Sequence, residues 1–141
     1  MGGAEPAVTV RRIAIVCAVS LIVAAVALGQ TETTVRDGVY SAEQAKRGRT
    51  IYDKTCASCH DGGTMGPELW GDPFLVEWDN KPAGAFFTRI QTTMPEDSPG
   101  SLSENDVLDV VAYVLQTNGF KAGDLAIQGA SALAAMRFVR R

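Results

Sequence analysis

Residues 56–60 read Cys56-Ala57-Ser58-Cys59-His60, and this stretch contains two of the three cysteines and the only histidine of the 141-residue chain. The residues before it have apolar side chains at helical spacing, and no segment around it alternates as a strand does. Two thiols and an imidazole therefore follow directly from the end of a predicted helix. This motif decides how the rest of the chain is interpreted.

The order Cys-x-x-Cys-His is typical of covalent haem attachment. Each thiol can form a thioether with one vinyl group of the haem, and His60 can offer its imidazole to the iron. A thioredoxin-like redox pair would be expected beside a βαβ pattern, and a zinc site would lack a fourth ligand unless a carboxylate joined it. A disulfide between Cys56 and Cys59 is a further alternative. We expect one haem c, bound through Cys56, Cys59 and His60.

A six-coordinate haem iron needs a second axial ligand, and methionine is the natural candidate once His60 is used. Met65 is too close to His60 in sequence to reach the opposite haem face, and Met136 lies in the C-terminal tail. Met94 precedes Pro95 in a polar loop that follows a predicted helix. A methionine can also be a gap-filling core residue. We expect Met94 to be the second iron ligand.

The fold class predicted is all-α, with three main helices. Ser41 and Gln44 predict a capping box at the start of the first helix, which runs into the cysteine motif. Ser103 is the predicted N-cap of the last main helix, and Asn118-Gly119 its C-cap. The apolar stripe of this last helix consists of Val107, Val110, Val111 and Val114, widened by Leu108 and Leu115.

Between these helices, glycines and prolines predict a loop over residues 61–82. A second helix is predicted over about 81–92, and it should stop at or just before Met94 because Pro95 disfavours helical geometry there. The tail, residues 121–141, is alanine-rich and could form an additional, weakly packed helix.

The N-terminal segment has the features of a secretory signal peptide. Arg11 and Arg12 precede an uncharged apolar run, residues 13–28, that ends in small residues. An uncleaved membrane anchor is the alternative, although a spanning helix needs about 20 apolar residues. Cys17 lies inside this run and reads as a small apolar residue. We expect the rest of the chain to lie in a periplasm, with membrane contact only if the segment is retained.

The composition fits one exported domain. The chain is 46% apolar and 21% charged, which excludes a disordered protein. It has 13 basic and 16 acidic residues without a basic stripe, so nucleic acid is not an expected partner. We divide it into a signal peptide (1–29), a flexible lead-in (30–36), a domain (37–120) and a C-terminal extension (121–141), and we expect a monomer. Removing residues 1–29 changes the formal net charge from −3 to −4.

Residues of about 37–120 resemble a monohaem class I cytochrome c. The resemblance rests on the cysteine–histidine motif, on Gly66-Pro67-Glu68-Leu69, on Thr93-Met94-Pro95 and on the two terminal helices. It implies the cytochrome c fold, in which helices and loops wrap one covalently bound haem. It also implies that the carbonyl oxygen of Pro67 accepts a hydrogen bond from the non-ligating nitrogen of His60.

The resemblance further places Gly48 and Tyr113 where the first and last helices cross, which explains a glycine within a helix. Trp70, Trp78 and Arg89 are candidates for contact with the haem propionates, because their side chains donate hydrogen bonds. Ordinary packing of the tryptophans and a solvated position for Arg89 are the alternatives, and of the three we assign Trp70 to the haem site.

The resemblance implies a one-electron carrier, not an enzyme, in a periplasmic respiratory or dehydrogenase-linked chain. Its donor would be a dehydrogenase or a membrane complex, and its acceptor an oxidase. The alternatives are a dedicated haem subunit of a dehydrogenase complex, or a haem enzyme or gas sensor if Met94 does not bind iron. Residues 96–109 carry five acidic residues and no basic one, unlike the lysine ring of mitochondrial cytochromes c. Docking is therefore expected at an apolar haem edge or on a basic partner surface.

Overall fold

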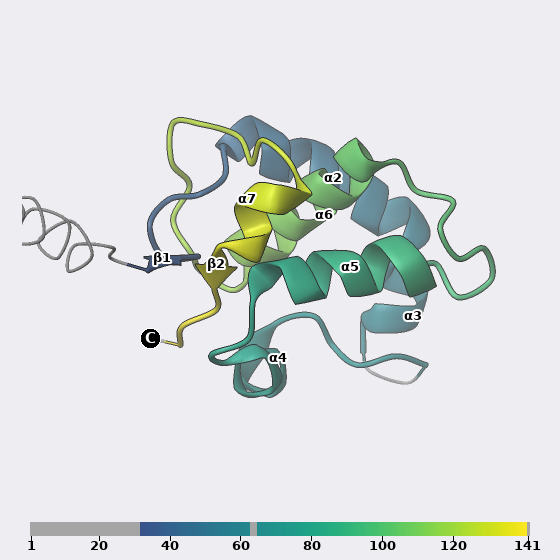
Figure 1. Cartoon of the computed structure of the whole chain (residues 1–141). Helices are drawn as coiled ribbons and strands as arrows, with labels where there is room; N and C mark the ends of the chain where they lie inside the picture. The colour runs from purple at the N-terminus through teal and green to yellow at the C-terminus, as the bar shows by residue number, and fades with distance from the viewer. Residues whose placement is uncertain (1–31, 63–64, 141) are drawn as a thin grey trace, which may run out of the picture. The chain divides into compact units, whose positions relative to one another are not determined.

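The computed structural model describes residues 32–62 and 65–140, so the predicted signal peptide and Cys17 lie outside the described residues. The described part confirms an all-α class and adds one short parallel strand pair (Figure 1). None of its helices is long and apolar enough to cross a membrane. In chain order the elements are β1 (Thr33–Thr34), α2 (Ala42–Thr55), α3 (Ala57–His60), α4 (Gly71–Trp78), α5 (Ala83–Thr93), α6 (Glu104–Thr117), α7 (Ala130–Ala134) and β2 (Met136–Arg137).

The two longest helices, α2 and α6, begin at the serines predicted to cap them. The Ser41 hydroxyl accepts a hydrogen bond from the Gln44 amide, and Ser103 does the same for Asp106. The box at Ser103 is complete, because the Asp106 carboxylate also accepts from the Ser103 amide. At Ser41 the box is half formed: the Ser41 hydroxyl accepts from the Gln44 amide, but the Gln44 side chain does not bond back to the Ser41 amide. The Gln44 side chain instead accepts from the Ile127 amide at 2.9 Å and donates to its carbonyl oxygen, so it ties α2 to the C-terminal tail.

The crossing of α2 and α6 is the main helix contact, and Gly48 lies in it as expected. A Cβ atom at Gly48 would lie 1.8 Å from the carbonyl oxygen of Asp109 and 3.0 Å from Cβ of Tyr113. Only glycine allows the two backbones to come this close. Beside the crossing, Arg47 forms a two-pronged ion pair with Asp109, at 2.7 and 2.8 Å, and this hydrogen bonding raises the pKa of Arg47. These contacts hold α2 and α6 together at their crossing.

Helix α4 corrects the prediction of a loop over residues 61–82. The chain is helical from Gly71 to Trp78, although Pro73 lies inside the helix. Proline is tolerated in a first helical turn, where the missing amide would have no intrahelical partner. Phe74 and Trp78, four residues apart, are the two buried side chains of α4. The proline therefore marks the start of a helix rather than a break in it.

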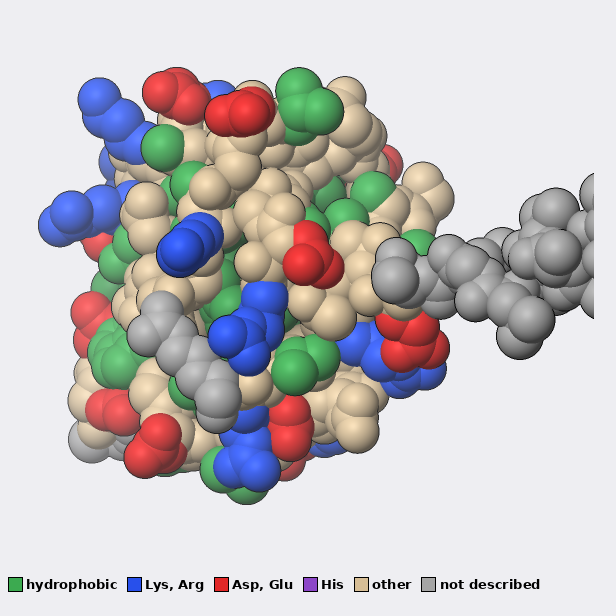
Figure 2. All heavy atoms as spheres, turned by 90° about the vertical axis from the view of Figure 1, so that its left-hand side faces the viewer, with side chains coloured by type: hydrophobic (Ala, Val, Ile, Leu, Met, Phe, Trp, Pro, Cys, Tyr) green, Lys and Arg blue, Asp and Glu red, His purple; other side chains and the backbone are tan. Residues whose placement is uncertain are grey.

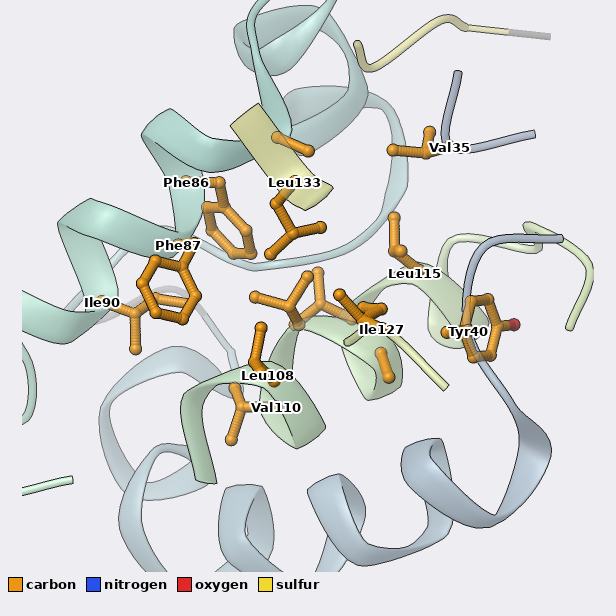
Figure 3. Packing of buried hydrophobic residues seen from close by; sticks show 14 of the residues in the cluster. Val35, Tyr40, Phe86, Phe87, Ile90, Leu108, Val110, Leu115, Ile127 and Leu133 are labelled. Carbon is orange, nitrogen blue, oxygen red and sulfur yellow. The ribbon is translucent and has the colours of Figure 1, made fainter. Parts of the chain in front are cut away.

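Both ends of the described chain pack against the domain. The structure describes residues 32–36 of the predicted flexible lead-in (30–36). In this part Thr33 pairs in register with Met136, and Val35 is fully buried, so residues 32–36 are not the flexible segment that was expected. The additional helix predicted in the tail is short, and it is not weakly packed, because Leu133 is fully buried. Figure 3 shows Leu133 pointing into the same interior as Phe86 of α5. The lead-in and the tail lack a helical period, so their burial was not visible in the sequence.

Candidate haem-binding site

A cavity of about 420 Å³ lies between α4, α5 and the loop after the cysteine motif. Its wall is mainly apolar and aromatic. Phe74 and Trp78 come from α4, and Phe86 and Ile90 come from α5. The sequence showed Phe86 and Ile90 as one side of a helix but gave no reason to place Phe74 at a site. The remaining residues that line the cavity are His60, Pro67, Glu68, Leu69, Pro73, Glu77, Arg89 and Met94.

His60 is the last residue of α3 and is held in one orientation. Its Nδ1 lies 2.7 Å from the carbonyl oxygen of Pro67, which is the hydrogen bond that the resemblance implied. A carbonyl oxygen can only accept, so Nδ1 carries the hydrogen and Nε2 keeps its lone pair. His60 as a whole is 9% exposed. An imidazole fixed in this way is ready to bind a metal through Nε2.

Gly66 allows this arrangement. A Cβ atom on Gly66 would lie 2.9 Å from Cε1 and 3.0 Å from Nδ1 of the His60 ring. The Gly66 amide also donates to the carbonyl oxygen of Cys59 at 3.0 Å, which turns the loop back over the motif. The loop can therefore present the Pro67 carbonyl to the imidazole only with glycine at this position.

Met94 lies where α5 ends, as the prediction for this helix required. It is the C-cap residue, and its amide donates to the carbonyl oxygen of Ile90 at 3.0 Å. Met94 is half-buried and lines the same cavity as His60. Met65 is 73% exposed, and Met136 is part of β2. Of these three candidates, only Met94 lies on the cavity.

The two cysteines have free thiols and are half-buried. Cys56 is the C-cap of α2, and Cys59 directly precedes His60 in α3. Burial is the main reason that the pKa of the Cys56 thiol rises to about 11, and the nearby Cys59 and Asp61 add to it. Within residues 32–62 and 65–140, no group of three or more His, Cys, Asp or Glu side chains could hold a metal ion. The zinc alternative therefore lacks a donor set in this part of the chain.

An aromatic cluster of Tyr52, Trp70 and Tyr113 lies next to the cysteine–histidine motif. The Tyr52 hydroxyl donates to Asp61 at 2.9 Å, and its ring packs against Tyr113 and Trp70, with centroids 5.1 and 6.2 Å away. Burial and then the bond to Asp61 raise the pKa of Tyr52, so it stays a neutral donor. Trp70 is thus turned toward Tyr52, and it is not among the residues lining the cavity.

Of the three candidates for the propionates, the structure places Trp78 and Arg89 on the cavity. Arg89 shares its part of the wall with Glu77. The pKa of Glu77 is lowered, mainly by its hydrogen bond with Lys81 and to a smaller degree by Arg89. Glu77 could not be found from the sequence, because its helix was predicted to be a loop.

These residues fit a covalently attached haem. The cavity wall is mainly apolar, His60 presents an imidazole whose Nδ1 is already hydrogen-bonded, and Met94 brings a thioether to the same cavity. Two free thiols directly precede His60 in the chain, at the spacing that thioether attachment requires. Cys56, Cys59, His60 and Met94 would hold the group, and Pro67 would orient the imidazole.

Comparison with known families agrees with this geometry. The family model described as cytochrome c oxidase, cbb3-type, subunit III, matches residues 43–114, which is half of the chain. The chain belongs to this family of c-type cytochrome domains, which indicates haem-based electron transfer. Searches of curated proteins and of solved structures found no match. The matched span contains the cysteine motif, Pro67 and Met94, and it ends before the C-terminal tail.

Proposed function

We propose that this chain is an exported one-electron carrier, which works in a periplasmic respiratory or dehydrogenase-linked chain. The observation that carries the proposal is that His60 and Met94 line one apolar cavity, with the imidazole held by Pro67. A bound haem c would supply one iron that changes between Fe(III) and Fe(II). Two protein ligands leave no iron position open to a substrate, so a carrier fits better than an enzyme.

The chain's own residues would set the reduction potential. The Met94 thioether is a soft, neutral ligand and favours Fe(II). The hydrogen bond from His60 to Pro67 acts in the opposite sense, because it makes the imidazole a stronger donor. The aromatic wall of Phe74, Trp78 and Phe86 would keep water from the iron, which disfavours the extra charge of Fe(III).

Two alternatives have different requirements. The family description names a subunit of an oxidase, so a stable place in a larger enzyme, including a dehydrogenase complex, is one alternative. It predicts co-purification with a catalytic chain. A haem enzyme or gas sensor is the other, and it requires that Met94 leave the iron open.

Replacing Met94 by alanine tests the proposal. The wild-type ferric protein should show the weak charge-transfer band of methionine-ligated haem at the red edge of the visible spectrum. Met94→Ala should lose it, lower the potential and bind carbon monoxide readily. Met65→Ala is the matched control, since Met65 is exposed, and it should keep the band. A wild-type protein without this band would contradict His60–Met94 ligation. A peptide of residues 56–60 without the haem mass would overturn the proposal altogether.

We further propose that residues 1–29 direct export to the periplasm. The support is the sequence pattern alone, since these residues lie outside the described part. The mass of the mature protein tests cleavage, and cell fractionation tests the compartment. A full-length chain recovered from the cytoplasm without haem would contradict export.

The proposed docking partner has a basic surface. Glu96 and Asp97 follow Met94 closely and are exposed, and Glu104 is exposed as well. Of the five acidic residues in 96–109, only Asp109 has a basic partner in the described structure, Arg47. The acidic charge near Met94 is therefore uncompensated, which favours approach of a positively charged surface.

A further inference from the structure

The last residues of the chain are attached to the connection between α4 and α5. We call residues 130–140 the C-terminal strap. Phe138 donates its amide to the carbonyl oxygen of Lys81 at 3.0 Å and accepts from the Asn80 amide at 2.9 Å. Arg140 donates to Asp79 twice, from its amide at 3.1 Å and from Nε at 3.0 Å. The strap thus bonds to three consecutive residues that leave α4.

The ring of Phe138 continues this attachment into the interior. It is 2% exposed and meets Phe74, Trp78 and Phe86, with centroids 5.7, 5.9 and 5.9 Å away. The contacts with Phe74 and Phe86 are edge-to-face, a favourable geometry for aromatic rings. All three partner rings line the haem cavity, and Phe138 itself does not. It therefore supports the cavity wall from the side away from the cavity.

The strap also packs against the first turn of α5. A Cβ atom on Gly84 would lie 2.9 Å from Cα of Ala134, so α7 and α5 pack backbone to backbone. At its other end α5 stops at Met94. Because a helix moves largely as a unit, the position of its first turn affects where Met94 lies.

Strand β2 joins the strap to β1, near the start of the described residues. Its partner β1 bonds in parallel register, and Arg137 lies 3.6 Å from Glu32. The face that carries β1 and β2 shows acidic and basic side chains interspersed (Figure 2). The strap is therefore held to the domain by hydrogen bonds, ion pairs and aromatic packing together.

We propose that Phe138 is a positioning residue for the haem site, and that the C-terminal strap holds the wall of α4 and α5 closed on the haem. Through this wall the strap keeps Met94 within reach of the iron. The inference rests on the proposed function for Met94, and it assigns a role to a segment outside the family match at 43–114. The wall rings come from two helices and also contact each other, with Phe86 lying 5.3 Å from Phe74 and 4.9 Å from Trp78 between ring centroids. Phe138 adds a contact with each of these three rings from outside the cavity.

The test compares two buried phenylalanines in the full-length holoprotein. Phe138→Leu removes the edge-to-face contacts while retaining most of the side-chain volume. Phe120→Leu is the matched control, because Phe120 is 6% exposed and the ring pairs of the cavity wall do not include it. Thermal unfolding measures the loss of stability in each variant, so that a general loss can be separated from a local one.

We expect Phe138→Leu to weaken the methionine charge-transfer band and to bind carbon monoxide about tenfold faster than wild type, a factor that matches the loss of aromatic contacts. We expect Phe120→Leu to leave both readouts at wild-type values at a comparable loss of stability. Equal readouts in the two variants, whether both unchanged or both altered, would overturn the inference.

Hydrogen exchange separates this inference from the proposed function. Phe138→Leu should speed amide exchange in α4 and in the first turn of α5, while Phe120→Leu should not. This readout does not depend on iron ligation. If wild type lacks the methionine band but α4 responds to Phe138→Leu alone, the proposed ligation fails and the support of the wall by the strap stands. If α4 exchanges alike in both variants, the strap proposal fails.

Discussion

The backbone of Gly48 in α2 packs directly on the carbonyl oxygen of Asp109 in α6. A Cβ atom at Gly48 would come within 1.8 Å of that oxygen. The two helices that begin and end the family-matched span are therefore in contact through backbone atoms, and their separation is set by one missing methyl group.

Gly48→Ala should destabilise the protein by about 3 kcal/mol or more, because the helices must separate to admit the methyl group. At an exposed helical site the same change would stabilise by about 1 kcal/mol, so the sign is diagnostic. Chemical denaturation of the holoprotein measures it. Lys46→Ala, at an exposed site two residues before Gly48 on α2, should change stability by no more than about 0.5 kcal/mol. A neutral or stabilising Gly48→Ala would show that the crossing is looser than described.

Gly66→Ala should disturb the axial histidine without removing it. The new methyl group would meet the imidazole of His60 and weaken its hydrogen bond to Pro67. A weaker bond makes the imidazole a poorer donor, so the reduction potential should rise. A loss of about 1 kcal/mol corresponds to roughly 40 mV for one electron. Redox titration measures the shift, with Ser58→Ala in the same motif as the control. A lower potential would contradict this account of the ligand.

The sequence predicted the parts of the site that are local. Ser41 and Ser103 cap their helices because a cap needs only the next three residues, and the valine stripe of α6 follows one period. The hydrogen bond from His60 to Pro67 could be predicted because the two residues are seven positions apart and belong to a motif of the family that the chain resembles. In each case the residues that interact are close together in the sequence.

What the sequence could not predict depends on distant partners. Pro73 looked like a helix breaker, although its place in a first turn is compatible with α4. Phe138 carries no periodic signal, and its ring finds Phe74, Trp78 and Phe86 only after the chain has folded back. Trp70 has the right chemistry for a propionate, but its ring packs against Tyr52 and it does not line the cavity. Tertiary packing, not local preference, decided these positions.

The carboxylate of Asp79 should titrate below its ordinary pKa of about 3.9. The amide of Arg140 is the main cause, with a smaller contribution from its side chain. A native pKa below the unfolded one means that the contact stabilises the fold above the ordinary pKa and is lost as pH falls through the lowered value. Acidification below about pH 4 should therefore loosen the C-terminal strap, seen as faster exchange at residues 137–140 after correction for intrinsic rates.

Two substitutions at Arg140 separate the causes of this lowered pKa. Arg140→Ala keeps the amide and should raise the pKa of Asp79 only partway toward its ordinary value. Arg140→Pro removes the amide hydrogen and should raise it further. NMR titration of the Asp79 carboxyl carbon provides the measurement. If Arg140→Ala raises the pKa of Asp79 as far as Arg140→Pro does, the side chain of Arg140, and not its amide, holds the carboxylate.

The acidic residues after Met94 should make electron exchange sensitive to the sign of the reagent's charge. Glu96 and Asp97 are exposed, and neither has an ion-pair partner among the described residues. Exchange with a cationic ruthenium hexaammine complex should therefore slow as salt is added, and exchange with anionic ferricyanide should speed up. Replacing both acids by lysine should reverse these slopes and slow the cationic reagent by roughly tenfold at low salt. Asp124→Lys, an exposed charge reversal outside residues 96–109, should have a smaller effect. If wild type already exchanges faster with the anion at low salt, the electron leaves through a different or basic surface, and the expected partner would be acidic.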